Sequence, residues 1–246
     1  MARGAAPVTI LGIDCASYQG VPDFAQVTGA GYRFVLDKVS EGTTYTNPLF
    51  PVTWPAIAAA GLARGVYHFA QPDQNTAKAE AAYFVQAVGA LAQGDVLALD
   101  IEAGSGDLSA WVLAWLQAVE AATGVTPIIY SSSSFMVAHG LTGDAALSGY
   151  GLWLAEYGVP TPTVPAPWGF WALWQNSGNG TVPGVVGACD IDEFNGTIAE
   201  FKAYGYQPAP VKPTPTNNDL VYFAKFLFSP SGPDLKGLSA ALQPFV

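Results

Sequence analysis

The stretch Val96-Leu-Ala-Leu-Asp-Ile-Glu102 decides the fold, because an apolar run ends abruptly in two carboxylates. Such a run is typical of a strand that is buried on both faces of a parallel sheet. Asp100 and Glu102 are two residues apart, so on a strand they share a face. Barrel enzymes keep their chemistry at the C-terminal ends of strands of this kind. We therefore expect a barrel with a carboxylate site at the end of this strand.

Two neighbouring carboxyl groups in a partly dry site can acquire different pKa values, so that one stays protonated while the other is ionised. Cleavage of a glycosidic bond needs this division of roles. Alternating acids on a strand more often form a solvated face. The apolar run before Asp100 favours the functional interpretation here.

Composition excludes several classes of protein. The chain has 246 residues, of which 50% are hydrophobic and 11% charged, as in globular proteins. The net charge of -10 argues against nucleic acid, which is bound through Lys and Arg. The absence of a run of 18 apolar residues predicts no membrane span. The first residues do not resemble a secretory signal, so export would need another route or a leader outside this sequence.

Metal and cofactor chemistry is not expected. Two cysteines, Cys15 and Cys189, are too few for a disulfide scaffold. The two histidines, His68 and His139, are far apart in sequence, which makes a zinc site of the usual Cys/His type improbable. The available chemistry is therefore that of carboxylates.

Strand-like segments recur along the chain, and the first five alternate with segments of helical character. Helices are predicted over 75–92, with Asn75 as a possible N-cap, and over 107–123, with Gly124 as the stop. After the fifth strand, proline and glycine predict loops instead of helices. The pattern predicts an α/β fold, a TIM-like barrel of the (β/α)5(β)3 type. The predicted strands are 8–17, 32–40, 63–70, 96–103, 126–131, 151–157, 169–176 and 187–194.

The composition changes at Pro208, where Pro208-Ala-Pro-Val-Lys-Pro-Thr-Pro-Thr216 predicts a stiff extended linker. We predict a barrel domain over 1–207, a Pro-rich linker over 208–218 and a tail over 219–246. The tail is too short to build a core alone. It is the start of a binding domain, a docking or oligomerisation segment, or an aggregation-prone remnant, and the sequence leaves this choice and the oligomeric state open.

Two further acids belong to the expected site. Asp14 ends the first apolar run, and Asp190 lies in the last strand. The first and last strands of a closed barrel are neighbours, so these side chains should converge with Asp100 and Glu102 at one mouth. Each acid taken singly would more often bind loop amides. As a set they indicate a functional cluster.

A set of short motifs follows one order along the chain. The motifs are Ile13-Asp14, Lys38-Val-Ser-Glu-Gly42, Tyr67-His-Phe69, Asp100-Ile-Glu102, Trp153-Leu-Ala-Glu-Tyr157, Trp174-Gln175 and Asp190-Ile-Asp192. In this order the chain resembles glycoside hydrolase family 25, the lysozymes (N-acetylmuramidases) common among phage endolysins and bacterial autolysins. The resemblance covers about residues 10–205, and the ordered set is more specific than any one motif. It implies the same (β/α)5(β)3 barrel.

The resemblance implies catalytic roles for the four acids. Glu102 matches the general acid, and Asp100 matches a group that steadies the positive intermediate or orients the substrate N-acetyl group. Asp14 and Asp190 match supporting acids that bind substrate and tune Glu102. An N-acetyl-assisted, retaining route and a direct attack by water both remain open. The chain departs from the family pattern at Cys15-Ala16-Ser17, at Asn176 and at Asp192, where Asn is common.

Aromatic side chains near predicted strand ends are candidates for sugar contacts. Tyr67 and Trp174 are the better candidates, and Tyr130 is a further one. For Trp153 and Tyr157, core packing is equally expected. Lys38 and Glu41 are predicted to form an ion pair that shapes the pocket, although a purely structural pair is as plausible.

Other polar residues have simpler interpretations. His68 should point away from Tyr67 and Phe69 and be a satisfied core or rim histidine, and His139 should lie in an exposed loop. Ser131–Ser134 lacks a nucleophile elbow and is interpreted as a turn. Cys15 and Cys189 should face outward beneath the helices. On adjacent strands they could be close, so the sequence leaves a pairing open, but we expect buried free thiols.

Together these features predict a peptidoglycan hydrolase that cuts the β-1,4 bond after N-acetylmuramic acid, with glycan strands as its partner. We expect it to act on the bacterial wall, as a phage lysin released at lysis, a virion component or a protein secreted by another route. The first rival is a glycan-binding or virion structural protein on the same barrel. The second rival is a chitinase-like barrel. Such a barrel would carry further acids on the strand before Asp100, but Val96 and Ala98 stand at those positions, so this rival lacks support.

Overall fold

The computed structural model describes residues 8–208 and 235–242. The chain divides into two compact units, 1–207 and 208–246. In the second unit the described element is helix α8 (Leu235–Leu242). Most of the predicted linker 208–218 and tail 219–246 lies outside the described residues. Among the helices that are described, none has the length and apolarity needed to cross a membrane.

Eight strands of the first unit close into a barrel, which confirms the predicted fold. Going round the barrel the order is β1, β2, β4, β5, β6, β7, β8 and β9, and β9 pairs with β1 to close it. Neighbours are parallel from β1 to β8, whereas β9 is antiparallel to both of its neighbours. The short β3 (Tyr45–Thr46) pairs with the end of β2. The barrel strands are β1 (Ile10–Cys15), β2 (Phe34–Glu41), β4 (Ala63–Phe69), β5 (Val96–Asp100), β6 (Ile128–Ser132), β7 (Leu152–Ala155), β8 (Leu173–Gly180) and β9 (Cys189–Phe194).

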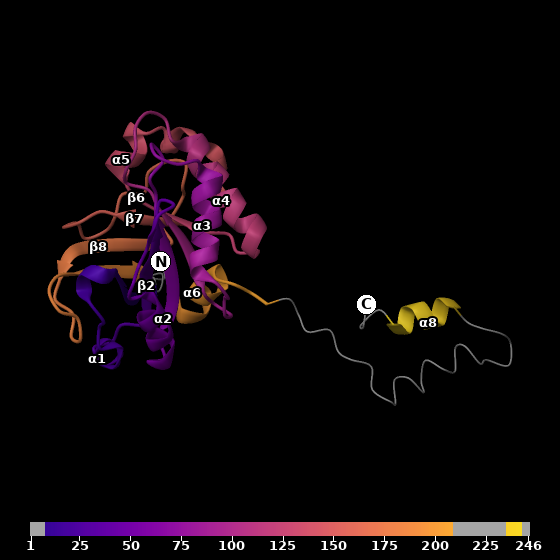
Figure 1. Ribbon diagram of the computed structural model, residues 1–246, viewed down its shortest axis with the longest axis horizontal. Helices are drawn as coiled ribbons and strands as arrows, with labels where there is room; N and C mark the ends of the chain where they lie inside the picture. Colours follow the sequence, from indigo (N-terminus) through magenta and orange to yellow (C-terminus); the bar gives the residue numbers. More distant parts are fainter. Residues whose placement is uncertain (1–7, 209–234, 243–246) are drawn as a thin grey trace, which may run out of the picture. The chain divides into compact units, whose positions relative to one another are not determined.

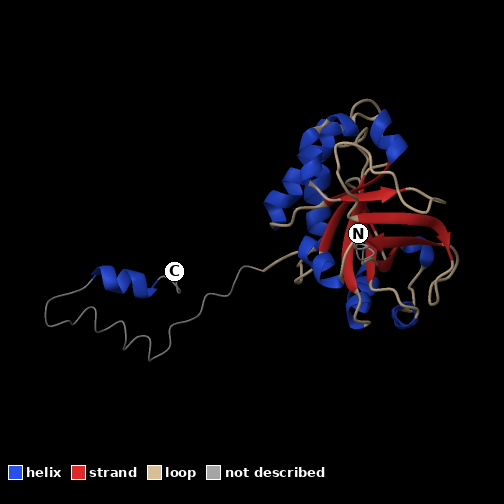
Figure 2. Cartoon of the chain, turned by 180° about the vertical axis from the view of Figure 1, so that it is seen from behind, coloured by secondary structure: helices blue, strands red, loops and turns tan. Residues whose placement is uncertain are grey.

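Helices lie outside the strands, and α3 and α4 pack side by side against them (Figure 1, Figure 2). A helix follows each of the first five parallel strands, and β7, β8 and β9 are joined by loops, as the proline and glycine pattern predicted. The helices are α1 (Phe24–Gly29), α2 (Phe50–Ala59), α3 (Ala77–Val88), α4 (Ser109–Thr123), α5 (Ser133–Ala138) and α6 (Ile198–Tyr204), with 3-10 turns η1 (Ser17–Gln19), η2 (Leu141–Gly143) and η3 (Ala145–Gly149).

Alternation along the strands creates two cores. On β5, Leu97 and Leu99 face the helices and pack in the outer core with Trp115 of α4. Val96 and Ala98 face the barrel interior, where they pack with residues such as Trp153. Asp100 continues the inward series, so the strand period carries its carboxyl group into the barrel mouth.

The helix ends follow local side-chain chemistry. Thr76, not the predicted Asn75, is the N-cap of α3, because its side chain accepts a hydrogen bond from Ala79 N. Gly124 ends α4 in the left-handed conformation with φ 71°, as predicted. The Ser131–Ser134 segment is not a turn, because Ser132 ends β6 and caps α5 by accepting from Phe135 N at 3.2 Å.

Candidate active site

A cavity of about 500 Å³ opens at the C-terminal ends of the parallel strands. The residues that line this cavity come from strand ends all round the barrel and from the loop after β1. Polar and aromatic side chains dominate this lining, which suits a polar ligand with flat apolar faces. We call this cavity the cleft; it is lined by Asp14, Ala16, Tyr18, Gln19, Lys38, Glu41, Tyr67, Phe69, Gln71, Asp100, Glu102, Tyr130, Trp153, Tyr157, Gln175 and Asp190.

The structure brings all four predicted acids to the cleft. Asp14 on β1 and Asp190 on β9 are direct register partners across the seam that closes the barrel. Asp100 ends β5, with Phe69 of β4 and Tyr130 of β6 on its two sides. Glu102 follows two residues later and is exposed to solvent through the cleft. Strand ends and barrel closure together assemble the cluster.

Burial raises the pKa of each of these acids, and repulsion between acids adds to the rise for Asp14, Asp100 and Glu102. Burial is the main cause for Asp100, whose pKa lies well above its ordinary value, and Glu102 adds to the rise. Burial also raises the pKa of Glu102, while Lys38 lowers it and Asp190 raises it. The pKa values of Asp14 and Asp190 are raised as well, again mainly by burial. Carboxyl groups in this site therefore keep their protons to a higher pH than the same groups do in water.

Gln175 organises one side of the cleft, although its role was not predicted. Its Nε2 donates to Asp14 Oδ2 at 2.6 Å. Its Oε1 accepts from the hydroxyl of Tyr130 at 2.8 Å and from that of Tyr157. One amide thus fixes an acid from β1, a phenol from β6 and a phenol from the segment after β7. The Trp174-Gln175 motif contained this signal, since an amide beside a tryptophan at a strand end is a hydrogen-bonding group for a polar pocket.

Asp192 lies beneath the cleft and does not line it. Its Oδ1 accepts from Trp153 Nε1 at 2.8 Å, while no donor among the described residues reaches Oδ2. Burial raises its pKa to about 8. A proton on Oδ2 would be shared toward Asp14, whose pKa Asp192 helps to raise. The interior therefore keeps one of these two carboxyl groups neutral near neutral pH.

Within residues 8–208 and 235–242, Lys38 is the only basic residue that lines the cleft. Its Nζ pairs with Glu41 Oε2 at 2.7 Å, as predicted, and lies 4.6 Å from the centre of the Phe69 ring. The ring face adds a cation–π attraction to the ion pair. The ammonium group is thus held by two side chains at the edge of the acid cluster.

The aromatic candidates fall into three groups. Tyr67, Tyr130 and Trp153 are buried in the cleft floor and pack edge to face. Tyr157 is 53% exposed at the rim. Trp174 does not line the cleft, contrary to the prediction, because Gln175 takes the inward face of β8.

Trp174 lies on the other face of β8, where its Nε1 donates to Glu156 O at 2.7 Å and its ring meets Trp171. Tyr18 lines the cleft from the turn η1 and is 88% exposed. Sequence reasoning missed Tyr18, since a short turn has no periodicity that would show where its side chain points.

The remaining predictions concern residues outside the cleft. His68 is fully buried and bonded to Ser40 Oγ and Glu80, which confirms a satisfied core histidine. His139 is partly exposed and its Nδ1 lies 2.8 Å from Gly106 O. Cys15 and Cys189 are free, buried thiols in the outer core, as expected. Within 8–208 and 235–242, no three His, Cys, Asp or Glu side chains are arranged to hold a metal ion.

A barrel with paired acids in an open, aromatic-lined cleft has the architecture of a glycoside hydrolase. Residues 13–185 match the family model described as glycosyl hydrolases family 25. The chain belongs to glycosyl hydrolases family 25, and it is a glycoside hydrolase.

Characterised relatives and solved structures agree with this assignment. The chain is 32% identical to lysozyme M1 of Streptomyces globisporus over 79% of this chain and 70% of the relative. It is 35% identical to the N,O-diacetylmuramidase of a Chalaropsis species, over 69% of this chain and 88% of that protein. The bacterial lysozyme of Streptomyces coelicolor superposes with a TM-score of 0.73 at 29% identity, covering 79% of this chain and 96% of that one.

Proposed function

We propose that Glu102 is the general acid with which this peptidoglycan hydrolase cleaves the β-1,4 bond between N-acetylmuramic acid and N-acetylglucosamine. The observation that supports this role is a carboxyl group with a raised pKa that is open to the cleft, two residues after a buried carboxyl group. The raised pKa lets Glu102 keep its proton at a pH where a free glutamic acid has lost it. That proton is then transferred to the leaving oxygen.

Asp100 is proposed to act on the other side of the same bond. Its Oδ1 is buried and has no donor among the described residues. A buried carboxylate oxygen without a partner is costly, so a ligand that supplies an N–H or a developing positive charge is attracted to it. A substrate N-acetyl group supplies the N–H, and the transition state of glycoside cleavage supplies the charge. Asp14 and Asp190 are proposed to bind substrate hydroxyls and to raise the proton affinity of their neighbours.

The carbohydrate is proposed to lie across the aromatic floor and rim of the cleft. Tyr67, Tyr130 and Trp153 offer ring edges and a hydroxyl from below, and Tyr157 offers a half-exposed ring at the side. Lys38 and Glu41 provide charged hydrogen-bonding groups at the opposite edge. Trp174 has no part in this proposal.

The test of catalysis compares Glu102→Gln with the wild type. The wild type should clear a suspension of bacterial cell walls, and the variant should lose at least about 100-fold in rate. Glu193→Gln is the matched control, because Glu193 lies on β9 outside the cleft and bonds Asn176. Equal clearing by wild type and Glu102→Gln would favour the rival, a binding or virion protein without turnover.

The test of bond specificity is reduction of the products with borohydride. New muramitol ends support cleavage after N-acetylmuramic acid, and glucosaminitol ends contradict it. The anomer first released, measured by NMR on a defined glycan, distinguishes retention from inversion. Retention would support participation of the substrate N-acetyl group.

The action on the bacterial cell wall leads to two finer proposals. We propose that residues 1–207 are the catalytic domain, so that a chain ending at Gln207 keeps its rate on soluble glycan fragments. We also propose a phage-lysin setting, in which the protein reaches the wall when the cell membrane is breached. Cells that express it should lyse only when a membrane-permeabilising agent is added, and lysis without that agent would contradict the proposal.

A further inference from the structure

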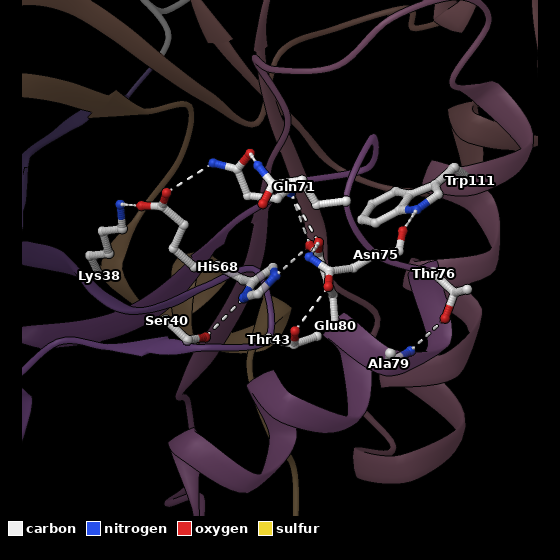
Figure 3. Close-up of polar contacts among 12 residues, drawn as sticks. Lys38, Ser40, Thr43, His68, Gln71, Asn75, Thr76, Ala79, Glu80 and Trp111 are labelled. Carbon is white, nitrogen blue, oxygen red and sulfur yellow. Dashed lines mark hydrogen bonds and ion pairs between the residues drawn. The ribbon is translucent and has the colours of Figure 1, made fainter.

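A buried polar network lies behind the cleft, between β2, β4 and α3 (Figure 3). Its centre is Glu80 of α3, which is completely buried. Both carboxylate oxygens lie 3.1 Å from the backbone N–H of Gln71. Asn75 Nδ2 donates to Oε1 at 2.9 Å, and His68 Nε2 lies 2.9 Å from Oε2. A buried carboxylate is stable only when it is bonded in this way, so the network is rigid.

His68 is the second buried member of the network. Burial lowers its pKa, so the ring is neutral near neutral pH. A neutral ring has one N–H, and the carboxylate of Glu80 accepts it from Nε2. Nδ1 then accepts from Ser40 Oγ at 2.8 Å. The ring stacks on Trp115 with centroids 5.6 Å apart, which fixes the plane of the imidazole.

Gln71 connects this network to the cleft. Its backbone is fixed by Glu80, and its side-chain Nε2 donates to Glu41 Oε1 at 2.9 Å. The other oxygen of Glu41 accepts from Lys38 Nζ at 2.7 Å. Hydrogen bonds therefore link the buried Glu80 to Gln71, Gln71 to Glu41 and Glu41 to the ammonium group of Lys38. Figure 3 labels Glu80, Gln71 and Lys38 along this path.

We propose that Gln71, anchored by the buried Glu80–His68 pair, is a positioning residue that holds the Glu41–Lys38 ion pair in place against the proposed catalytic carboxyl groups. The Lys38 side chain is buried, whereas the Glu41 side chain is 34% exposed. A partly exposed carboxylate keeps rotamer freedom unless another group holds it, and the amide of Gln71 supplies that hold. The positioning role goes beyond the proposed function, and it rests on that function only for the role of Glu102 as general acid.

The position of Lys38 matters because, among the residues that the structure describes, it is the only cation that lines the cleft. It lowers the pKa values of Glu102 and Asp100 against the effect of burial. The other titratable groups that line the cleft are acids and phenols, and of these Asp190 raises the pKa of Glu102. They are Asp14 on β1, Tyr18 in η1, Glu41 on β2, Tyr67 on β4, Asp100 on β5, Tyr130 on β6, Tyr157 after β7 and Asp190 on β9. Displacement of Lys38 should therefore raise the pKa of Glu102.

The test uses Gln71→Met, which keeps the side-chain length and the backbone N–H but removes the donor to Glu41. The pKa of Glu102 is measured in the full chain by NMR titration of carboxyl-labelled glutamate, with Glu102→Gln to assign the signal. We expect the titration midpoint to rise by about half a pH unit, and by more in Lys38→Met. Gln74→Met is the control, because the exposed Gln74 donates to Gln71 Oε1 and does not reach Glu41; its midpoint should equal that of the wild type.

An unchanged midpoint in Gln71→Met, with a clear rise in Lys38→Met, would overturn the positioning role. An unchanged midpoint in both would overturn the charge argument itself. Where the enzyme turns over, the alkaline limb of kcat/KM should move to higher pH in Gln71→Met with little change in KM. The titration needs no turnover, so a shifted midpoint in a protein that leaves cell walls intact would support the positioning role while contradicting the proposed function.

A second variant tests the anchor. In Glu80→Gln one carboxylate oxygen becomes an N–H₂ group that faces donors, so Gln71 should lose its fixed backbone. We expect the same direction of shift for Glu102 in protein that is still folded by its thermal transition. The new amide should donate to His68 Nε2, so the ring proton should move from Nε2 to Nδ1. This exchange of donor and acceptor roles would be visible in the ¹⁵N shifts of the two ring nitrogens. A normal Glu102 midpoint with exchanged histidine roles would show that the anchor does not reach the cleft.

Discussion

Replacing Asp192 with asparagine should make the stability of the protein less sensitive to rising pH. The folded protein raises the pKa of this buried acid from 3.8 to about 8. The folded state therefore keeps a proton that the unfolded chain releases, and stability falls as the pH rises between these two values. Each pH unit in that range costs about 1.4 kcal/mol for one fully shifted group, or roughly 2–3 kcal/mol between pH 5 and pH 7.

The geometry around Asp192 indicates that asparagine can replace it. The amide oxygen can accept from Trp153 Nε1, as Oδ1 does at 2.8 Å. The amide N–H₂ takes the place of Oδ2, which lacks a donor among the described residues, and can donate toward Asp14. The exchange thus replaces a titrating group with a neutral one of the same shape.

The assay is urea unfolding followed by tryptophan fluorescence at several pH values from 5 to 8. The free energy of unfolding of Asp192→Asn, relative to that of the wild type, should increase as the pH rises. This difference should be about 2–3 kcal/mol larger at pH 7 than at pH 5. Glu193→Gln, one residue along β9, serves as the control and should follow the wild-type pH dependence. A constant difference between Asp192→Asn and wild type across this range would refute the burial argument.

Three further outcomes are expected. Tyr18→Ala should raise KM for glycan several-fold with little effect on the thermal transition, because this ring lines the cleft and is 88% exposed; an unchanged KM would contradict a ligand contact. Trp174→Phe should keep kcat/KM and lose about 1 kcal/mol of stability with the hydrogen bond to Glu156 O, measured by urea unfolding. Cys15 and Cys189 should react with a thiol reagent only after unfolding, since burial raises the pKa of both, that of Cys189 to about 12; rapid labelling of the native protein would exclude this.

Strand periodicity explains what could be predicted from sequence. The apolar run before Asp100 fixed both the strand and its burial, and alternation then placed Leu99 outward and Asp100 inward. The same alternation correctly predicted that His68 points away from Tyr67, to the opposite face of the strand. Convergence of Asp14 and Asp190 followed from closure of the barrel, because closure makes the first and last strands neighbours.

Features that depend on packing between segments could not be predicted. Trp174 was placed in the cleft by its proximity to a strand end, although Gln175 takes the inward face of that strand. The pairing of Glu80 with His68 joins a helix to a strand, and nothing in the local sequence indicates which acid will be buried. Gln71 lies in the loop between β4 and α3, where no period applies.

The pairing of β1 with β9, which closes the barrel, has a consequence for how the protein folds. Asp14 and Asp190 meet only when the two ends of the barrel domain join, so the repulsion between the acids first arises at that step. Contacts between distant parts of a chain form slowly, and here the slow contact is also the charged one. Mild acid, which neutralises these side chains, should therefore speed refolding at the seam, and activity should return no earlier than the ring of strands is complete.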